Sequence, residues 1–429
     1  MSVLVPLFAM FGCFAIGVPI AYALGIAAIA GGLYVGVPLP AVMLQISSGV
    51  GKFAMLTIPF FVLAGAIMAE GGMARRLVAL ANVIVGYTRL RGGLSVVNVL
   101  ATTFLSGISG SAVADTSAIG SVLIPQMVES GYPRAFATDV TISASVQALL
   151  VPPSHNAVIY SVATGGLISV ISLFMAGVMP GLLLGFAIIL LCLFYAYRDR
   201  HPRGMVVPAG QALRIAGEAF WGLVTLGIIL GGILGGVFTA IEAGAVACVW
   251  AFFVTMFIYR DYRWRDLPLL VTRTLRTVAM VLTLIAFAGS LGYIMAMVQM
   301  PAKVTDFFLT LSHNKYVILF LVNVLLLLLG TFMDMAPSIL ITTPILLPVM
   351  ANFGVNPVHF GIIMMLNLGI GLCHPPVGGI LFVGCAVGEI SMEQVVKSIW
   401  PFYLVMFAVL MLVTYIPAIS LWLPHSLGL

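Results

Sequence analysis

Apolar runs follow one another along almost the whole chain, and short polar or arginine-bearing segments separate them. A helix needs about 20 apolar residues to cross a bilayer. Residues 170–197 and 278–298 form runs of that length. Other runs are interrupted halfway by glycines, hydroxyl-bearing residues or paired prolines. The pattern predicts an all-α polytopic membrane protein in which some helices cross the bilayer and others break inside it.

The first interruption lies in residues 104–121, FLSGISGSAVADTSAIGS, where small polar side chains and flexible backbone crowd together. The apolar flanks on either side are too short to span a bilayer. The simplest interpretation is a re-entrant helical hairpin over about residues 93–127. Irregular backbone at membrane depth persists only when it is buried in protein or lines a watery cavity. This stretch is therefore predicted to lie at an ion or solute site.

Three further interruptions follow the same plan. VPPSHN at residues 151–156 breaks a helix predicted over about residues 135–165. GTFMDMAPSILITTP, which starts at Gly330, forms the turn of a second hairpin predicted over about residues 316–350. CHPPVGG, which starts at Cys373, breaks a helix predicted over about residues 358–388. The sequence thus predicts two re-entrant hairpins, each followed by a broken helix.

Arginine clusters predict the orientation of the chain, because short cytoplasmic loops are enriched in Arg and Lys. Two spans separate the basic segments at residues 198–214 and 260–276, so both fall on one face together with Arg134. A single span after the second segment places Lys303 on the opposite face. The two hairpins therefore enter from opposite sides, as an inverted repeat. Its parts are residues 1–200 as the first repeat, 201–217 as a cytoplasmic loop and 218–429 as the second repeat.

Matching residues at one constant separation support this internal repeat. The separation between Pro152 and Pro375 recurs between four other pairs, Gly107 and Gly330, Pro125 and Pro348, Met127 and Met350, and Gly131 and Gly354. Inverted repeats with interrupted helices are typical of secondary transporters that hold their site at the repeat interface. Two amphipathic segments, residues 77–85 and 303–312, are predicted to lie along the membrane interface.

Composition agrees with this class. Of 429 residues, 62% are hydrophobic and 7% are charged, whereas soluble chains carry about 25% charged residues. The net charge of +5 comes with arginines that lie between apolar runs, so it does not indicate nucleic-acid binding. No basic segment precedes the first apolar run, so no cleavable signal is expected. The five cysteines form no CxxC pair and are predicted to be small buried thiols.

Broken helix ends supply the groups expected at the site. Carbonyls at half-helix C-termini and hydroxyl oxygens coordinate Na⁺, whereas half-helix N-termini favour an anion. The predicted Na⁺ ligands are Ser106, Gly107, Ser109, Ser111, Pro152, Ser154, Gly330, Thr331, Asp334, Gly369 and Gly371. The predicted substrate-binding residues are Asp115, Thr116, Asn156, Pro337, Ser338, His374 and Gly378. No organic cofactor is expected.

Other interpretations of these residues stay open. Glycines also permit close packing of membrane helices, and Asp115 or Asp334 at a helix start also caps the backbone. His155 and His374 adjoin the two proline pairs, where either a proton relay or a structural histidine fits. An intramembrane hydrolase using an Asp or His dyad is a remote alternative. The absence of a P-loop motif argues against ATP hydrolysis, and paired hairpins in one chain argue against a channel.

Several segments together resemble the large membrane subunit of tripartite ATP-independent periplasmic (TRAP) transporters, the DctM-like family. They are TIPFFVLAGAIMAEGG, SGISGSAVADTSAIGSVLIPQM, GYPRAFA, the PPS break, GGVFTAIEAGAVA, GTFMDMAPSILITTPILLP and HPPVGG, and they cover essentially the whole chain. One departure is Ala240, where the family leads us to expect a proline, so the turn before Glu242 is expected to be less rigid.

The resemblance implies Na⁺-coupled import of an organic acid, such as a C4-dicarboxylate or a sialic acid, across the bacterial inner membrane. It implies two partners besides the lipid bilayer: a DctQ-like small membrane subunit, expected as a separate chain, and a DctP-like periplasmic substrate-binding protein. It also implies an elevator-like mechanism, in which the amphipathic segments link a fixed scaffold to a moving carrier. A stand-alone anion carrier driven by Na⁺ or H⁺ is the main alternative.

Overall fold

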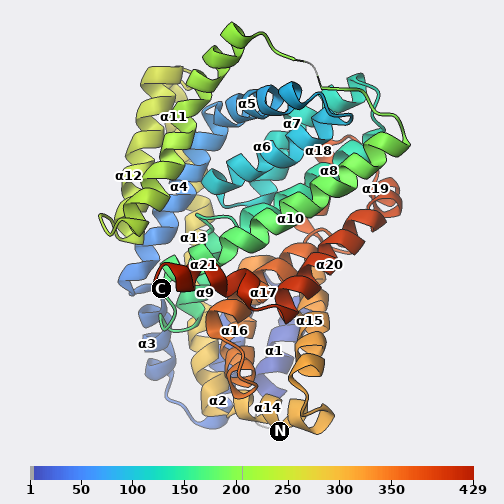
Figure 1. Ribbon diagram of the computed structural model, residues 1–429. Coiled ribbons are helices and arrows are strands. Elements are labelled where there is room, and N and C mark those ends of the chain that lie inside the picture. Colours follow the sequence, from blue (N-terminus) through green and yellow to red (C-terminus); the bar gives the residue numbers. More distant parts are fainter. Residues whose placement is uncertain (1–3, 205) are drawn as a thin grey trace.

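The computed structural model describes residues 4–204 and 206–429, and within these ranges it is built from helices and turns without a named strand (Figure 1). Six of the described helices are long and apolar enough to cross a membrane, or up to nine if each of three bent pairs counts as one span. The prediction of an all-α chain with several membrane-length helices is confirmed for the described residues.

The described helices of the first part of the chain are α1 (Leu4–Ala15), α2 (Ile20–Val35), α3 (Leu39–Val50), η1 (Phe53–Leu56), α4 (Thr57–Glu70), α5 (Met73–Thr88), α6 (Gly93–Ser109), α7 (Ala112–Glu129), α8 (Arg134–Ser145), η2 (Val146–Leu149), α9 (His155–Ala163) and α10 (Val170–Arg198). Those of the second part are α11 (Ala209–Leu234), α12 (Ala240–Phe253), η3 (Val254–Tyr259), η4 (Trp264–Asp266), α13 (Leu267–Met297), α14 (Met300–Leu311), α15 (Lys315–Phe332), α16 (Met335–Asn352), α17 (Pro357–Gly371), α18 (Gly379–Val387), α19 (Met392–Ser398), α20 (Trp400–Tyr415) and α21 (Ala418–Ser426).

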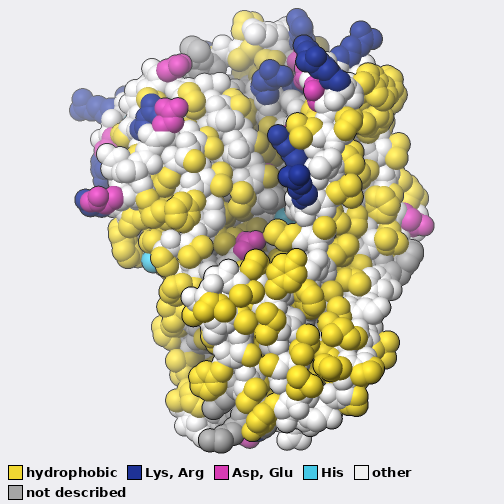
Figure 2. Space-filling view, turned by 180° about the vertical axis from the view of Figure 1, so that it is seen from behind, with side chains coloured by type: hydrophobic (Ala, Val, Ile, Leu, Met, Phe, Trp, Pro, Cys, Tyr) yellow, Lys and Arg dark blue, Asp and Glu magenta, His cyan; other side chains and the backbone are white. Residues whose placement is uncertain are grey.

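The helices divide between two ends of the molecule. In Figure 1, α5–α8, α11, α12 and α18 occupy the upper part, and α1–α3 and α14–α17 occupy the lower part. The long helix α10 runs across the middle and packs against α20, α21 and α6. On the face shown in Figure 2, Lys and Arg side chains gather over the upper half, and hydrophobic side chains dominate the lower half.

Local sequence explains where the first hairpin turns. Gly110 ends α6 in the left-handed conformation, with φ of 60°, and its N–H donates to the carbonyl of Ser106. Ser111 then begins α7 as its N-cap, and its hydroxyl accepts the N–H of Ala114. Glycine adopts positive φ without steric cost, and serine satisfies an otherwise unpaired N–H at a helix start. In the second hairpin, Asp334 caps α16 by accepting the N–H of Met335 at 2.8 Å.

The other two predicted interruptions also fall between described helices. Residues 150–154, with Pro152 and Pro153, separate η2 from α9, and residues 372–378, with Pro375 and Pro376, separate α17 from α18. Both Pro-Pro peptide bonds are cis. Proline lacks an N–H and cannot continue the helical ladder. The inverted relation of the two halves, and the repeat boundaries, stay predictions.

Several boundaries differ from those predicted. The segment predicted as a cytoplasmic loop at residues 201–217 becomes helical at Ala209, where α11 begins. Arg273 and Arg276, predicted to lie in a basic stretch before the span, belong to α13. A membrane helix can carry them near its end, because long arginine side chains reach from the helix to the membrane surface. The final apolar run splits at Pro417 into α20 and α21, which are bent by 57°. The turn before Glu242 is closed by a capping box with Thr239.

Close packing at one break leads to a stability prediction. Gly177 of α10 lies against the backbone carbonyl of Leu150, and a Cβ at this position would collide with that oxygen. We expect Gly177→Ala to destabilise the fold by about 1–3 kcal/mol, the usual cost of overpacking. The matched control is Gly227→Ala in α11, where nothing lies within 4 Å of the added Cβ. Thermal unfolding in detergent should give a lower midpoint for the first variant alone. Equal midpoints would contradict this packing.

Candidate functional site

Both hairpin turns and both helix breaks meet at one cavity of about 410 Å³. Its lining comes from the first hairpin (Ser109, Ser111, Ala112, Val113, Ala114), the first break (Leu149, His155, Asn156), the second hairpin (Asp334, Met335, Ala336) and the second break (Leu372). Helices α4 and α13 close the remaining sides. The structure therefore brings together segments that the sequence predicted to converge, including Ser109, Ser111, Asn156 and Asp334 of the candidate site residues.

Three helix N-termini border this cavity. The first residues of α7, α9 and α16 all belong to its lining, and each of these helices begins directly after a break. Backbone N–H groups in the first turn of a helix have no intrahelical acceptor, and the helix dipole adds partial positive charge there. No lysine or arginine lines the cavity in the described part of the chain. The cavity can thus favour a small anion without a fixed cationic side chain.

An oxygen cluster lies behind the first hairpin turn. Asp115 of α7 is fully buried, and it accepts hydrogen bonds from Ser106, at 2.7 Å, and from Ser109. A serine hydroxyl that donates its hydrogen keeps lone pairs that can coordinate a cation. Asp115 does not line the cavity, although the sequence grouped it with substrate-binding residues. The cluster offers hard oxygen ligands and one negative charge, which suit Na⁺.

The second hairpin packs tightly on the second break. A Cβ on Gly371 would lie 2.7 Å from the backbone of Gly330, and the N–H of Val377 donates to the carbonyl of Thr331 at 3.2 Å. The two glycines thus allow two backbones to touch, which is the packing role left open for them. Gly369 instead makes room for the side chains of Leu149 and Val146 of η2, which a Cβ at this position would crowd.

Several other candidate residues make local contacts. The hydroxyls of Thr116, Ser154, Thr331 and Ser338 donate to backbone carbonyls of their own segments. The imidazole of His374 contacts the carbonyl of Pro375 at 2.7 Å and lies beside the ring of Tyr403, outside the cavity lining. Pro152 contributes its carbonyl near Gly107, while Pro337 lies in the first turn of α16 and Gly378 caps α18. These residues shape the breaks around the cavity.

Sequence reasoning missed the walls of the cavity. Gly65 of α4 lies against the backbone of Ser109, with 3.1 Å between an added Cβ and the Ser109 carbonyl oxygen. Thr277, Met280 and Leu284 line the cavity at helical spacing along α13. Residues 278–298, most of α13, were predicted only as an ordinary span, and α4 was given no role at the site. The cluster of small residues at positions 64–66 was the available signal, because small residues mark close helix approach in membranes.

His155 also occupies the cavity, although the sequence left its role undecided. It is the first residue of α9, and its ring has no hydrogen-bond partner within the described ranges. The described residues contain no group of three or more His, Cys, Asp or Glu side chains placed to hold a metal ion. All five cysteines are free and buried, as predicted. The polar groups that face the cavity are therefore hydroxyls, an amide, an imidazole, a carboxylate and helix N-termini.

Comparisons of sequence identify one family, and a comparison of structures finds a similar fold. Residues 7–419 match the family model described as the tripartite ATP-independent periplasmic transporter, DctM component. The chain is 42% identical over 427 residues to the uncharacterized protein YgiK of Salmonella typhimurium, with 98% of this chain and 97% of that protein covered. It is 38% identical over 405 residues to the C4-dicarboxylate TRAP transporter large permease protein DctM of Rhodobacter capsulatus, with 92% of each covered. Its fold is similar to the YdaH transporter of Alcanivorax borkumensis, with a TM-score of 0.66, 14% identity, and coverage of 96% and 97%.

Proposed function

Because the chain belongs to the DctM family of TRAP transporter large permease subunits, we propose that it imports an organic acid by coupling it to Na⁺. The family is one of transporter subunits, so the chain is not an enzyme and the intramembrane hydrolase is excluded. The Rhodobacter capsulatus relative is named as a C4-dicarboxylate transporter, so a C4-dicarboxylate is the first candidate substrate. A sialic acid, which a relative of the same family transports by name, is the second.

One observation carries this proposal: three helix N-termini border a single cavity, and Ser109, which lines the same cavity, donates to the buried carboxylate of Asp115 behind it. The N-termini suit the carboxylate of the substrate. Asp115, Ser106 and Ser109 suit Na⁺, which neutralises the buried charge of Asp115 and brings positive charge next to the anion. Because each ion stabilises the other in a site with low dielectric constant, Na⁺ and substrate bind together. This is the thermodynamic basis of coupling.

His155 supplies direct recognition of the substrate in this proposal. Its ring shares the cavity with Asp334, and its nitrogen atoms have no competing partner within the described ranges. Ser111 also faces the cavity, and its oxygen accepts the N–H of Ala114 at 3.4 Å, so its hydrogen is available for a ligand. Asn156 adds an amide beside them. These groups bind carboxylate and hydroxyl oxygens of a small acid.

Movement of the cavity across the membrane completes the proposal. Helices α4 and α13 form one wall, and the hairpin turns and breaks form the other. Small residues face each other along this boundary, as Gly65 of α4 lies against Ser109 of the first hairpin. Surfaces without protruding side chains can slide past one another, as an elevator-like mechanism requires. The proposed partners are a DctQ-like small subunit and a DctP-like periplasmic binding protein, and the proposed location is the bacterial inner membrane.

Uptake into proteoliposomes tests the function. The chain and its small partner are reconstituted, and a labelled C4-dicarboxylate or sialic acid is added outside with the cognate binding protein. We expect uptake only when Na⁺ is outside and the binding protein is present, because the anion needs both delivery and a co-bound cation. Uptake without the binding protein would establish a stand-alone carrier. Equal uptake in K⁺ would refute sodium coupling and favour a proton-coupled mechanism.

A further inference from the structure

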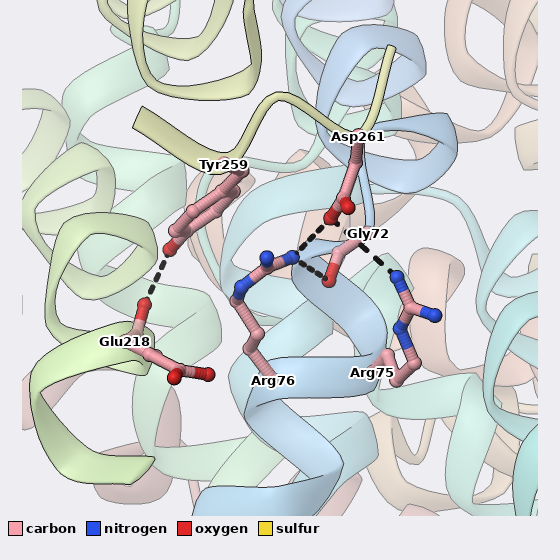
Figure 3. Close-up of polar contacts among 6 residues, drawn as sticks. All are labelled: Gly72, Arg75, Arg76, Glu218, Tyr259 and Asp261. Carbon is pink, nitrogen blue, oxygen red and sulfur yellow. Dashed lines mark hydrogen bonds and ion pairs between the residues drawn. The ribbon is translucent and has the colours of Figure 1, made fainter. Parts of the chain in front are cut away.

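A cluster of charged residues joins α5 to the connection between η3 and η4, which lies far from α5 in the sequence. Arg76 of α5 pairs with Asp261 at 2.5 Å, and Arg75 approaches the same carboxylate at 3.5 Å. Arg76 also donates to the carbonyl of Gly72 at 3.0 Å. Figure 3 shows Asp261 lying between the two arginines, above the start of the helix that carries them. One carboxylate thus holds the first turn of α5.

An aromatic residue completes the cluster. The guanidinium of Arg76 lies 3.7 Å from the centre of the Tyr259 ring, and the Tyr259 hydroxyl donates to the carbonyl of Glu218 in α11 at 2.6 Å. The side chains of Arg76 and Asp261 are 17% and 26% exposed. An isolated surface ion pair contributes little to stability. The Arg76–Asp261 pair is largely shielded from solvent, and its guanidinium also contacts the Tyr259 ring and the Gly72 carbonyl. These contacts fix its geometry more strongly than that of an isolated surface pair.

The backbone at this corner is shaped to receive Asp261. Helices α4 and α5 meet at an angle of 67° across Gly71 and Gly72. Gly72 has a φ of 74°, and a Cβ there would collide with the Asp261 carboxylate. A Cβ on Gly71 would lie 2.5 Å from the side chain of Thr255 in η3. The two glycines let η3 and Asp261 approach the bend, so the angle between α4 and α5 depends on this contact.

Helix α5 connects two parts of the molecule with different roles in the proposed transport. It packs against α11 on one side and against α6, the first helix of the first hairpin, on the other. Its second half borders a cavity of about 610 Å³ that Gln126 and Glu129 of α7 also line. The helix is thus held firmly at its first turn and has open space beside its far end.

We propose that Asp261 is a positioning residue that fixes α5 as a stiff arm between the α4–α11–α12 side and the first hairpin. This inference rests on the proposed transport function. By clamping Arg76, Asp261 sets the angle at the α4–α5 corner, and therefore the position of α6 and of the Ser109 turn at its end. Loss of this contact leaves the substrate cavity intact but allows α5 to pivot. The first hairpin is then no longer held in a defined position during translocation.

Transport kinetics of Asp261→Asn test this role. We expect Vmax to fall about tenfold, equivalent to about 1.4 kcal/mol in the translocation barrier, while the half-saturating concentrations of substrate and Na⁺ stay the same. The charge-exchanged double variant, Arg76→Asp with Asp261→Arg, should recover part of the Vmax lost by either single change. The matched control is Glu393→Gln, which removes an exposed ion pair with Lys397 on α19, and it should transport normally. An unchanged Vmax in Asp261→Asn overturns the clamp.

A distance measurement decides the question without relying on transport. Spin labels at Tyr87 of α5 and Leu213 of α11, which are 50% and 78% exposed, report the angle of the arm. All five native cysteines are buried. We expect the distance distribution to broaden in Asp261→Asn and to stay narrow in Glu393→Gln. An unchanged distance distribution in Asp261→Asn refutes the clamp even where uptake is reduced. Failure of the unsubstituted chain to take up substrate would refute the proposed function and leave this readout intact.

Discussion

An Asp115→Asn variant is expected to need about a hundredfold more Na⁺ for half-maximal uptake, equivalent to about 2.7 kcal/mol of lost binding. Asp115 is fully buried in α7 and accepts the hydroxyls of Ser106 and Ser109. Asparagine has nearly the same shape, but it carries no charge and has only one accepting oxygen. Its buried site can no longer offset the charge of Na⁺, and one serine loses its acceptor.

Sodium titrations of uptake in proteoliposomes would measure this effect. Ser121→Ala is the matched control, because Ser121 is an exposed residue of the same helix whose hydroxyl donates only to the carbonyl of Ala118. The control should keep the sodium dependence of the unsubstituted chain. Thermal unfolding midpoints of both variants would show that Asp115→Asn is folded. Sodium activation within a few-fold of the unsubstituted chain would remove Asp115 from the cation site.

The breaks in the helices could be predicted because their residues act locally. Gly110 and Ser111 stop and restart a helix through their own backbone and hydroxyl groups, and Pro152-Pro153 and Pro375-Pro376 remove N–H donors wherever they occur. Membrane-length apolar runs likewise predict spanning helices directly from the sequence. The convergence of the breaks on one cavity followed from topology, since irregular backbone at membrane depth needs a common polar environment.

The walls of the cavity could not be predicted in the same way. Thr277 and Met280 lie on a helix whose apolar pattern fits any membrane span, and only packing decides which side faces the cavity. Roles within the site also depend on distances that the sequence does not contain. Asp115 and His374 were both predicted to bind substrate. Asp115 instead accepts hydrogen bonds from Ser106 and Ser109, and His374 lies beside Tyr403, outside the cavity lining. The start of α13 was misplaced because exposed arginines are compatible with both a loop and a helix.

His155→Ala is expected to raise the half-saturating substrate concentration about thirtyfold, since a hydrogen bond to a charged ligand contributes about 1.5–3 kcal/mol. The ring of His155 borders the cavity and has no protein hydrogen-bond partner within the described ranges, so its removal takes away a contact that only the substrate uses. The half-saturating Na⁺ concentration should change much less, because the Asp115 cluster lies on another helix. Steady-state uptake at several substrate concentrations, with saturating Na⁺, measures the effect.

A His155→Gln variant separates recognition from proton transfer. Glutamine keeps a neutral hydrogen-bond donor and acceptor but cannot carry a proton at physiological pH, so recognition predicts a smaller loss than for alanine. A proton relay predicts that both variants lose uptake equally, with or without Na⁺. His313→Gln is the matched control, because His313 is exposed in the connection between α14 and α15. Unchanged substrate saturation in His155→Ala would show that the ring faces the cavity without binding the substrate, and helix N-termini would then be the main anion ligands.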